Sequence, residues 1–387
     1  MIYFDYTATT PIDKEVMEIY IKTQNNFFAN INSLHKLGQK SNFMFEKATE
    51  ELKQELGLKH NIIYTSNATE ANNLGIFGVV ERYEKGKIIT TKIEHPSVFE
   101  VFKNLEARGY EVVYLDVDAN GIINLTQLEE ELNKDVLLVS VMWVNNIVGS
   151  IQPIDKVIKL VKKYPKVKLH VDVVQGICKI VPNFDFNDID LLSLSGHKIY
   201  APKGIGLLAV RENVELASRL YGASNQYKIK PGTLDLALVV ALCKAVKIFA
   251  PQVEEHFIYV QALNKQLREK VSKFKNIIIN SPENASPYIF NISIPNIQGE
   301  TLLHYLEEDE IFVSTGSACS SKLKKPEKTI YAMTNSLERA TTSVRISLSH
   351  LTTSQEVEKL IKALEKLENV WFNFSPLRRN DFKEKEL

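Results

Sequence analysis

Short apolar runs alternate with amphipathic stretches through the first two thirds of the chain. The runs that read as strands cover residues 62–65, 87–91, 112–115, 136–141, 168–172 and 190–193. Helical periodicity lies between them, as at 97–108 and 154–164. Strands that alternate with helices predict an α/β fold, with a mostly parallel sheet flanked by helices. Ligands of such sheets bind beyond the carboxyl ends of the strands.

The pattern changes after Pro251. It then predicts a smaller α+β domain with helices at 254–274, 299–308 and 354–367 and strands at 276–279 and 288–294. We expect an N-terminal segment at 1–14 that joins this small domain, a large domain at 15–250, the small domain at 251–375 and a solvated tail at 376–387. The segment 234–249 is apolar nearly all round, so it should be a buried helix that carries a domain or subunit contact.

Composition narrows the class of protein. The 387 residues contain 47 Lys and Arg against 47 Asp and Glu, without a basic block, so neither nucleic acid nor a membrane surface is the expected partner. No apolar stretch approaches the length of a transmembrane helix, and the first residues lack the layout of a signal peptide, so we expect a cytoplasmic protein. The three cysteines, Cys178, Cys243 and Cys319, have no metal-ligand spacing, so no metal site is expected.

One lysine follows a small polar turn at the end of a predicted strand, in the run Ser195-Gly196-His197-Lys198. An amine attacks an aldehyde only where its surroundings favour the neutral or imine form, and a turn beside a buried strand supplies such surroundings. If the aldehyde belongs to a phosphorylated cofactor, Ser195 and His197 can donate hydrogen bonds to the oxygens of its phosphate. The same residues are also common in loops, so the turn alone leaves both readings open.

Polar residues follow three other predicted strands. Ala68 and Thr69 open a helix whose N–H groups and Thr69 hydroxyl could hold a phosphate, although an ordinary helix cap has the same pattern. Asp172 ends a strand, where it could pair with a pyridinium N–H or cap a helix. His95 could stack on a ring and move protons, or be structural.

In the order Thr69, His95, Asp172, Lys198, these groups resemble the fold-type I pyridoxal-phosphate enzymes, and within them the class V aminotransferase group and its cysteine desulfurases of the NifS and IscS type. The resemblance runs from residues 3–11 to 343–348. The segment 313–322, which contains Cys319, decides the subfamily, although by itself a cysteine among small residues is more often a packing residue.

The resemblance assigns roles by position. Lys198 would hold pyridoxal 5'-phosphate as an internal aldimine, with Asp172 on the pyridine nitrogen, Gln175 at the phenolic oxygen and His95 over the ring. The other implied cofactor residues are Ala68, Thr69, Asn146, Ser195, Gly196 and His197, together with Thr233 from the neighbouring subunit of a homodimer. Arg345 would bind the substrate carboxylate through its planar guanidinium, and Asn30 would also contact substrate.

The implied reaction is a sulfur transfer. L-cysteine would become L-alanine, and Cys319 would keep a persulfide for an acceptor such as an iron-sulfur scaffold or a tRNA-thiolation protein, with a transient iron-sulfur contact of Cys319 as its only metal chemistry. The chain departs from the family pattern at 222–233, where Lys230 stands in place of an arginine. His350 also stands where an arginine is common.

Three alternatives remain to be weighed. The first is another class V enzyme, an aminotransferase or a selenocysteine or cysteine lyase, that does not use Cys319. The second is a non-catalytic docking protein for sulfur transfer, which would be expected to have lost Lys198 or Asp172. The third, an NAD-binding protein, fails because no G-x-G-x-x-G turn follows the first strand. The sulfur acceptor and the choice between cysteine and selenocysteine stay open.

Overall fold

The computed structural model describes residues 1–223, 226–315 and 326–373, with side chains as far as residue 369. Its main element is a seven-stranded sheet in the order β2-β8-β7-β6-β5-β3-β4. The strands are β2 (Asn61–Thr65), β3 (Lys87–Thr91), β4 (Glu111–Leu115), β5 (Val136–Met142), β6 (Lys168–Asp172), β7 (Leu191–Ser195) and β8 (Gly206–Val210). Every neighbouring pair is parallel except the two that include β8. The predicted mostly parallel sheet is therefore confirmed.

The six predicted strands of this sheet lie within two residues of the observed ones, but β8 was not predicted. It runs antiparallel to both β2 and β7, and residues 196–205 join it to β7 without a crossover helix. A pattern that alternates strands with helices gives no signal for such an insertion. Gly206 begins β8 where a Cβ atom would lie 2.6 Å from the Leu194 carbonyl oxygen, so a side chain would not fit there.

Both faces of the sheet are covered, which explains why its strands read as continuous apolar runs. Neighbouring residues along a strand point to opposite faces. Ile63, Ile88 and Leu138 pack in one core cluster with α3 (Ala68–Val80) and α4 (Pro96–Ala107). Their neighbours Ile62, Ile89 and Val139 belong to the cluster that includes α6 (Ile154–Val161) and α7 (Leu236–Phe249).

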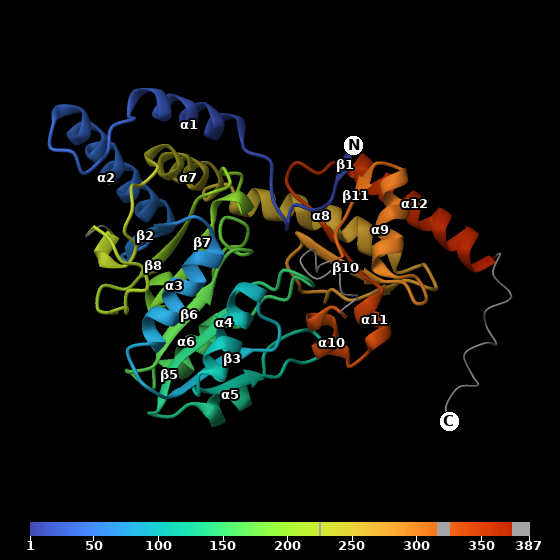
Figure 1. Cartoon of the computed structure of the whole chain (residues 1–387). Coiled ribbons are helices and arrows are strands. Elements are labelled where there is room, and N and C mark those ends of the chain that lie inside the picture. Colours follow the sequence, from blue (N-terminus) through green and yellow to red (C-terminus); the bar gives the residue numbers. More distant parts are fainter. Residues whose placement is uncertain (224–225, 316–325, 374–387) are drawn as a thin grey trace.

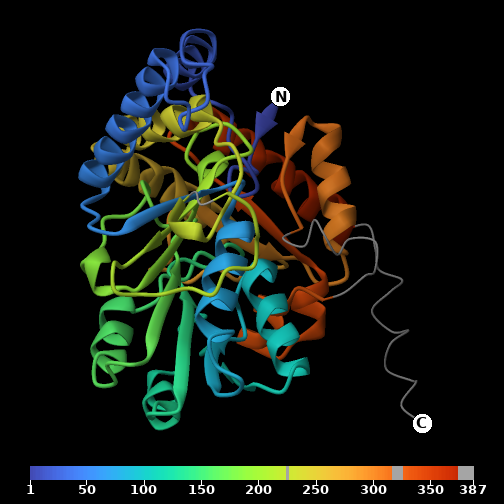
Figure 2. The same cartoon turned by 60° about the vertical axis from the view of Figure 1, so that its left-hand side comes forward.

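Helix α7 has the buried position that its composition predicts, and Cys243 within it is 4% exposed. It packs against α1 (Lys14–Asn26) and α2 (Lys36–Leu56), which cover it on the outside (Figure 2). Among the described residues no single helix is long and apolar enough to cross a membrane, although α7 and α8 (Val253–Val271), bent by 70°, reach that length and composition as a pair.

The second part of the chain surrounds a three-stranded sheet of order β12-β10-β9, drawn at the right of Figure 1. The sheet is antiparallel and consists of β9 (Ile278–Ile279), β10 (Ile289–Ser293) and β12 (Ser343–Ser347). Its helices are α8, α9 (Gly299–Glu308), α10 (Lys328–Thr334), α11 (Leu337–Thr341) and α12 (Ser354–Asn373). The N-terminal β1 (Ile2–Tyr3) pairs in parallel with β11 (Ile311–Phe312) beside it. The predicted domain boundaries themselves stay a prediction, and the tail at 376–387 lies outside the described residues.

The topology gathers the predicted site at one edge of the large sheet. Strands β3, β5, β6 and β7 are parallel, so their carboxyl ends share that edge. Strand β2 is antiparallel to β8, and β8 is antiparallel to β7, so β2 also ends there. Segments that are far apart in sequence therefore meet at this edge.

Candidate active site

Lys198 lies at this edge in the short helix η2 (Gly196–Lys198), which directly follows β7. Its Nζ donates to the backbone oxygens of Thr7 at 2.7 Å and Ala8 at 2.6 Å. Burial, together with the nearby charges of Arg345 and Lys179, lowers the pKa of the Lys198 amine to about 7. Part of the amine is therefore unprotonated at neutral pH, as a nucleophilic lysine requires.

Asp172, the last residue of β6, is 6% exposed. Its Oδ1 accepts a hydrogen bond from the Val174 N–H, and its Oδ2 accepts one from Asn72 Nδ2, both at 3.0 Å. Burial raises the pKa of Asp172, while these donors and the Lys198 charge act against the rise. A buried carboxyl group of this kind is suited to pairing with a cationic N–H group.

His95 forms the N-cap of α4. Its Nδ1 accepts the Ser97 N–H at 3.1 Å and lies 2.7 Å from Ser97 Oγ. Burial lowers the pKa of His95 to about 4, with further contributions from the charges of Lys198 and Lys328. The imidazole is therefore neutral at physiological pH.

Gln175 is held on both sides of its amide group. Its Nε2 donates to the Thr7 carbonyl at 3.1 Å, and its Oε1 accepts from Lys179 Nζ at 3.0 Å. Burial lowers the pKa of Lys179 to about 8. Sequence reasoning missed Lys179, whose only signal is its place four residues after Gln175 in the same segment.

The residues predicted to hold phosphate combine an unpartnered hydroxyl with a helix start. Ser195 Oγ is buried and has no hydrogen-bond partner among the described residues, so it can serve a ligand oxygen. The next residue, Gly196, has little space for a side chain, because a Cβ atom on it would lie 3.0 Å from Ile205 Cγ2. His197 Nδ1 lies 3.1 Å from Thr9 Oγ1.

Helix α3 begins at Ala68 after the N-cap Asn67, with Thr69 exposed in its first turn. The N–H groups of such a helix start can hold an anion. Lys230, which replaces an arginine of the family pattern, places its Nζ 3.0 Å from Glu70 Oε2 in the same turn. This lysine therefore reaches the helix start within a single chain.

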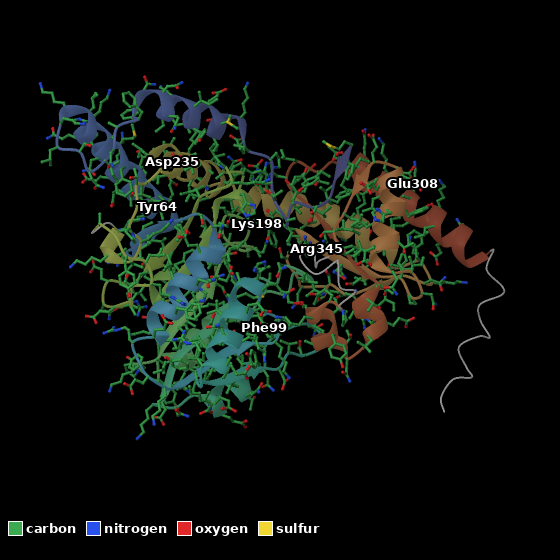
Figure 3. All side chains as sticks on the ribbon, viewed as in Figure 1. Tyr64, Phe99, Lys198, Asp235, Glu308 and Arg345 are labelled. Carbon is green, nitrogen blue, oxygen red and sulfur yellow. The ribbon has the colours of Figure 1, made fainter. Side chains whose placement is uncertain are left out.

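Arg345 lies on β12, across from Lys198 (Figure 3), and is 4% exposed. Its Nη2 donates to Asp5 Oδ1 at 2.8 Å, and its Nη1 donates to the Asn146 carbonyl oxygen at 3.0 Å. Its Nε is buried without a partner among the described residues and remains available to a carboxylate. Asp5 was not predicted, because only the fold brings the N-terminus to β12.

Two other predicted residues lie at the surface of the single chain. Thr233 and Asn30 are exposed, and Asn30 Oδ1 accepts the Asn32 N–H at 2.9 Å within its own turn. Their proposed roles stay predictions. Cys319 lies outside the described residues.

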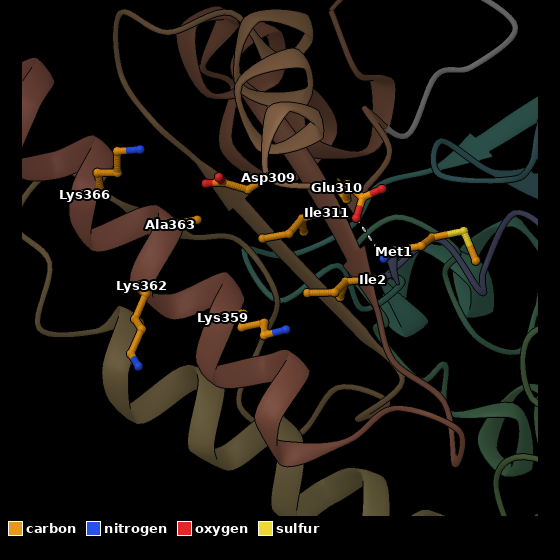
Figure 4. Close-up of a pocket in the computed structure, with 9 residues that line it drawn as sticks. All are labelled: Met1, Ile2, Asp309, Glu310, Ile311, Lys359, Lys362, Ala363 and Lys366. Carbon is orange, nitrogen blue, oxygen red and sulfur yellow. Dashed lines mark hydrogen bonds and ion pairs between the residues drawn. The ribbon is translucent and has the colours of Figure 1, made fainter.

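Figure 4 shows a separate surface hollow of about 320 Å³ beside α12, where Ile2 and Ile311 contribute apolar side chains. Lys359, Lys362 and Lys366 lie on its helical side. Neither Lys198 nor His95 lines this hollow.

Comparisons with known proteins identify the family of this chain. The model of the class V aminotransferases matches residues 2–360. A relative named cysteine desulfurase IscS, from Dictyoglomus turgidum, is 34% identical over 383 residues, which cover 98% of this chain and 97% of that protein. A solved structure of a NifS-like protein has a TM-score of 0.88 at 33% identity and covers 96% of this chain and 99% of its own. A second, SspA in complex with cysteine, has a TM-score of 0.79 at 32% identity and covers 91% and 100%. The chain therefore belongs to the class V aminotransferase family, in its group of NifS-type and IscS-type cysteine desulfurases.

Proposed function

We propose that this protein is a pyridoxal-phosphate-dependent cysteine desulfurase that converts L-cysteine to L-alanine and keeps the sulfur as a persulfide on Cys319. The observation that carries the proposal is a buried lysine, Lys198, at the carboxyl end of β7 in a chain that aligns with a cysteine desulfurase over nearly its whole length. The relative solved with cysteine, SspA, supports L-cysteine as the substrate.

The residues present fit the cofactor. The unpartnered Ser195 Oγ and the start of α3 are suited to its phosphate, and the buried Asp172 carboxyl group is suited to its ring nitrogen. Lys198 would hold it covalently, and one hydrogen of Gln175 Nε2 remains for its phenolic oxygen, because the other donates to Thr7. When bound, pyridoxal phosphate acts as an electron sink for bonds at the substrate α-carbon.

The protein's own groups would handle substrate and protons. Arg345 would bind the substrate carboxylate through Nε and the edge of its guanidinium, while Asp5 and the Asn146 carbonyl fix its orientation. Lys198 can accept a proton at Nζ and return it, because a pKa near neutrality favours transfer in both directions.

The sulfur-transfer step is a displacement at the substrate sulfur. The Cys319 thiolate attacks Sγ of the substrate, a sulfur-sulfur bond forms and the carbon-sulfur bond breaks. The released electron pair stays with the substrate carbon, which takes up a proton on the way to alanine. The persulfide then passes its outer sulfur to an acceptor, which we propose to be an iron-sulfur scaffold or a tRNA-thiolation protein.

Replacing Cys319 by serine tests the proposal. We expect Cys319→Ser to retain the absorption band of lysine-bound pyridoxal phosphate but to lose persulfide formation and acceptor-dependent sulfur transfer. Alanine release from L-cysteine should fall together with the persulfide. Turnover at the wild-type rate without the thiol would instead identify a class V enzyme of another kind. A wild-type protein that forms no cofactor band would favour the non-catalytic docking protein.

We also propose that the active form is a homodimer. Large apolar side chains are exposed on the single chain around α1 and α2, with Phe28 75%, Leu34 91% and Phe43 68% exposed. Thr233 is likewise exposed, as a residue that serves a neighbouring subunit would be in an isolated chain.

Mixing two inactive variants tests the shared site. Chains with Lys198→Ala and chains with Thr233→Ala should regain activity after joint refolding, because a mixed dimer contains one site with both residues intact. Sedimentation should show a dimer. A monomer with full activity would contradict this proposal.

A further inference from the structure

One buried amide joins two groups of the candidate site. Asn72 of α3 is completely buried, and its Nδ2 donates to Asp172 Oδ2 at 3.0 Å and to Ser97 Oγ at 2.9 Å. Ser97, 8% exposed, in turn lies 2.7 Å from His95 Nδ1. A continuous hydrogen-bonded chain therefore runs from Asp172 through Asn72 and Ser97 to His95.

The direction of each hydrogen bond follows from what its atoms can do. A carboxylate only accepts, so the amide nitrogen of Asn72, and not its oxygen, faces Asp172. Ser97 Oγ accepts the second amide hydrogen, and the acceptor then available to its own hydrogen is His95 Nδ1. The Ser97 backbone N–H points at the same Nδ1 at 3.1 Å. With two donors directed at it, Nδ1 carries no hydrogen, and the imidazole proton resides on Nε2.

We propose that Asn72 and Ser97 are positioning residues that hold His95 as the neutral tautomer protonated at Nε2 and couple it to Asp172. The inference deepens the proposed desulfurase function and rests on it for its chemical meaning. In this state His95 presents a fixed hydrogen-bond donor at Nε2 to the reacting groups. Nε2 can accept a proton only after the ring has changed to the tautomer protonated at Nδ1. That change requires the Ser97 hydroxyl to turn away from Nδ1.

The charges around His95 act in the same direction. Among the described residues, the cations that act on it are Lys198 of η2, Lys328 of α10 and Arg345 of β12, and all three oppose a positive imidazole. Glu94 precedes it and is itself a buried acid. Donors at Nδ1 and cations nearby together favour the neutral ring.

The unpartnered atom of Asn72 also argues for this role. Asn72 Oδ1 is buried without a hydrogen-bond partner in the described part of the chain, which is a cost that a leucine at this position would avoid. In return, the asparagine provides an NH2 group that donates hydrogen bonds to both Asp172 and Ser97.

The tautomer can be measured directly. The full-length protein, labelled with ¹⁵N in its histidines, is studied by long-range ¹H–¹⁵N NMR with and without pyridoxal phosphate, and His95 is assigned from its loss in His95→Gln. The wild type should show an unprotonated Nδ1 and a protonated Nε2. Ser97→Ala removes one donor and should move the tautomer ratio about fivefold toward Nδ1–H and the His95 titration upward by about half a pH unit.

Two further variants separate positioning from packing. Asn72→Leu should shift the tautomer ratio and the titration of His95 in the same direction as Ser97→Ala. It should also weaken pyridoxal phosphate binding in an absorbance titration, because Asp172 loses a hydrogen-bond donor. Ser97→Ala should leave that affinity within about twofold, since Asp172 keeps its contacts. The matched control is Asn73→Leu, because Asn73 lies on the same helix and, within the described part of the chain, donates only to the Thr69 carbonyl, at 2.8 Å. Asn73→Leu should change neither the His95 NMR signals nor the affinity for pyridoxal phosphate.

The proposal is overturned if Nδ1 carries the proton in the wild type, or if Ser97→Ala leaves the His95 spectrum unchanged. Should Asn72→Leu fail to fold, the result from Ser97→Ala decides alone. The NMR signals do not depend on turnover. A protein with the expected tautomer but without desulfurase activity would contradict the proposed function and leave the tautomer assignment standing.

Discussion

Glu94 makes the stability of this protein depend on pH in an unusual direction. The side chain is 2% exposed, and its Oε1 accepts hydrogen bonds from Thr91 Oγ1 at 2.9 Å and from the Met142 N–H at 2.8 Å. Its Oε2 is buried without a partner among the described residues. Burial, together with the nearby Asp172 charge, raises the pKa of Glu94 from 4.5 to about 8. The group is therefore a neutral acid at pH 7.

The sign and size of the effect follow from proton binding. The folded state holds the Glu94 proton more tightly than the unfolded state, so this stabilisation is complete below pH 4.5 and is lost as the pH rises toward about 8. Each pH unit in that window costs about 1.4 kcal/mol of unfolding free energy. At pH 7 the loss is about 3 kcal/mol relative to acidic solution.

Glu94→Gln removes the titration and keeps the acceptor at Oε1. Its amide nitrogen takes the place of the unpartnered Oε2, which should cost about 1 to 3 kcal/mol at pH 5, where the wild-type acid is already neutral. The stability of the variant relative to the wild type should increase as the pH rises, by about 3.5 kcal/mol between about pH 5 and pH 8, so that the variant becomes the more stable protein.

Urea unfolding of the cofactor-free full-length proteins across this pH range measures the difference, because the other titrating groups cancel between them. Trp143, 1% exposed, reports unfolding through its emission. Glu84→Gln, at an exposed position, is the control for the substitution itself, and its difference from the wild type should stay near zero. A difference between Glu94→Gln and the wild type that does not change with pH would refute the reasoning.

Three other predictions concern the site and its support. Because the pKa of Lys198 is about 7, cofactor incorporation into the apo protein should speed up about tenfold per pH unit below 7 and level off above it, as followed by absorbance. Arg345→Lys loses planar recognition and should raise KM for L-cysteine about 10-fold to 100-fold with a smaller change in kcat, as steady-state kinetics would show. Gly176→Ala would place a Cβ atom 2.2 Å from Trp143 Cε3 and should cost about 1 to 3 kcal/mol in urea unfolding.

The sequence predicts the site best where a strand ends. Strands β3 and β6 have the bounds that their apolar runs predict, and Asp172 is the last residue of β6. Parallel strands buried on both faces have to be apolar along their length, so a polar residue at the carboxyl end stands out. Since parallel strands end at one edge, this signal also locates Lys198 and His95.

The supporting residues have no such signal. Asn72 lies within α3 and meets Asp172 across 100 residues, and Asp5 meets Arg345 across 340. Nothing in the periodicity of a helix distinguishes an asparagine that faces another strand end from one that faces solvent. The contacts arise from the order of strands in the sheet, which includes the unpredicted antiparallel β8.

Under the proposed function, the charges at the site would also connect substrate binding with proton transfer. The Arg345 charge is one cause of the low Lys198 pKa, and Asp5 offsets only part of it. A substrate carboxylate that pairs with Arg345 cancels more of that charge, and the affinity of Lys198 for a proton then rises. In the cofactor-free protein, the lower pKa keeps part of the Lys198 amine neutral and ready to bind an aldehyde. Once substrate is bound, the higher pKa makes the same amine a better acceptor for the proton of the α-carbon. Under the proposed function, Arg345 would thereby serve both recognition of the substrate carboxylate and proton transfer at Lys198 through one charge.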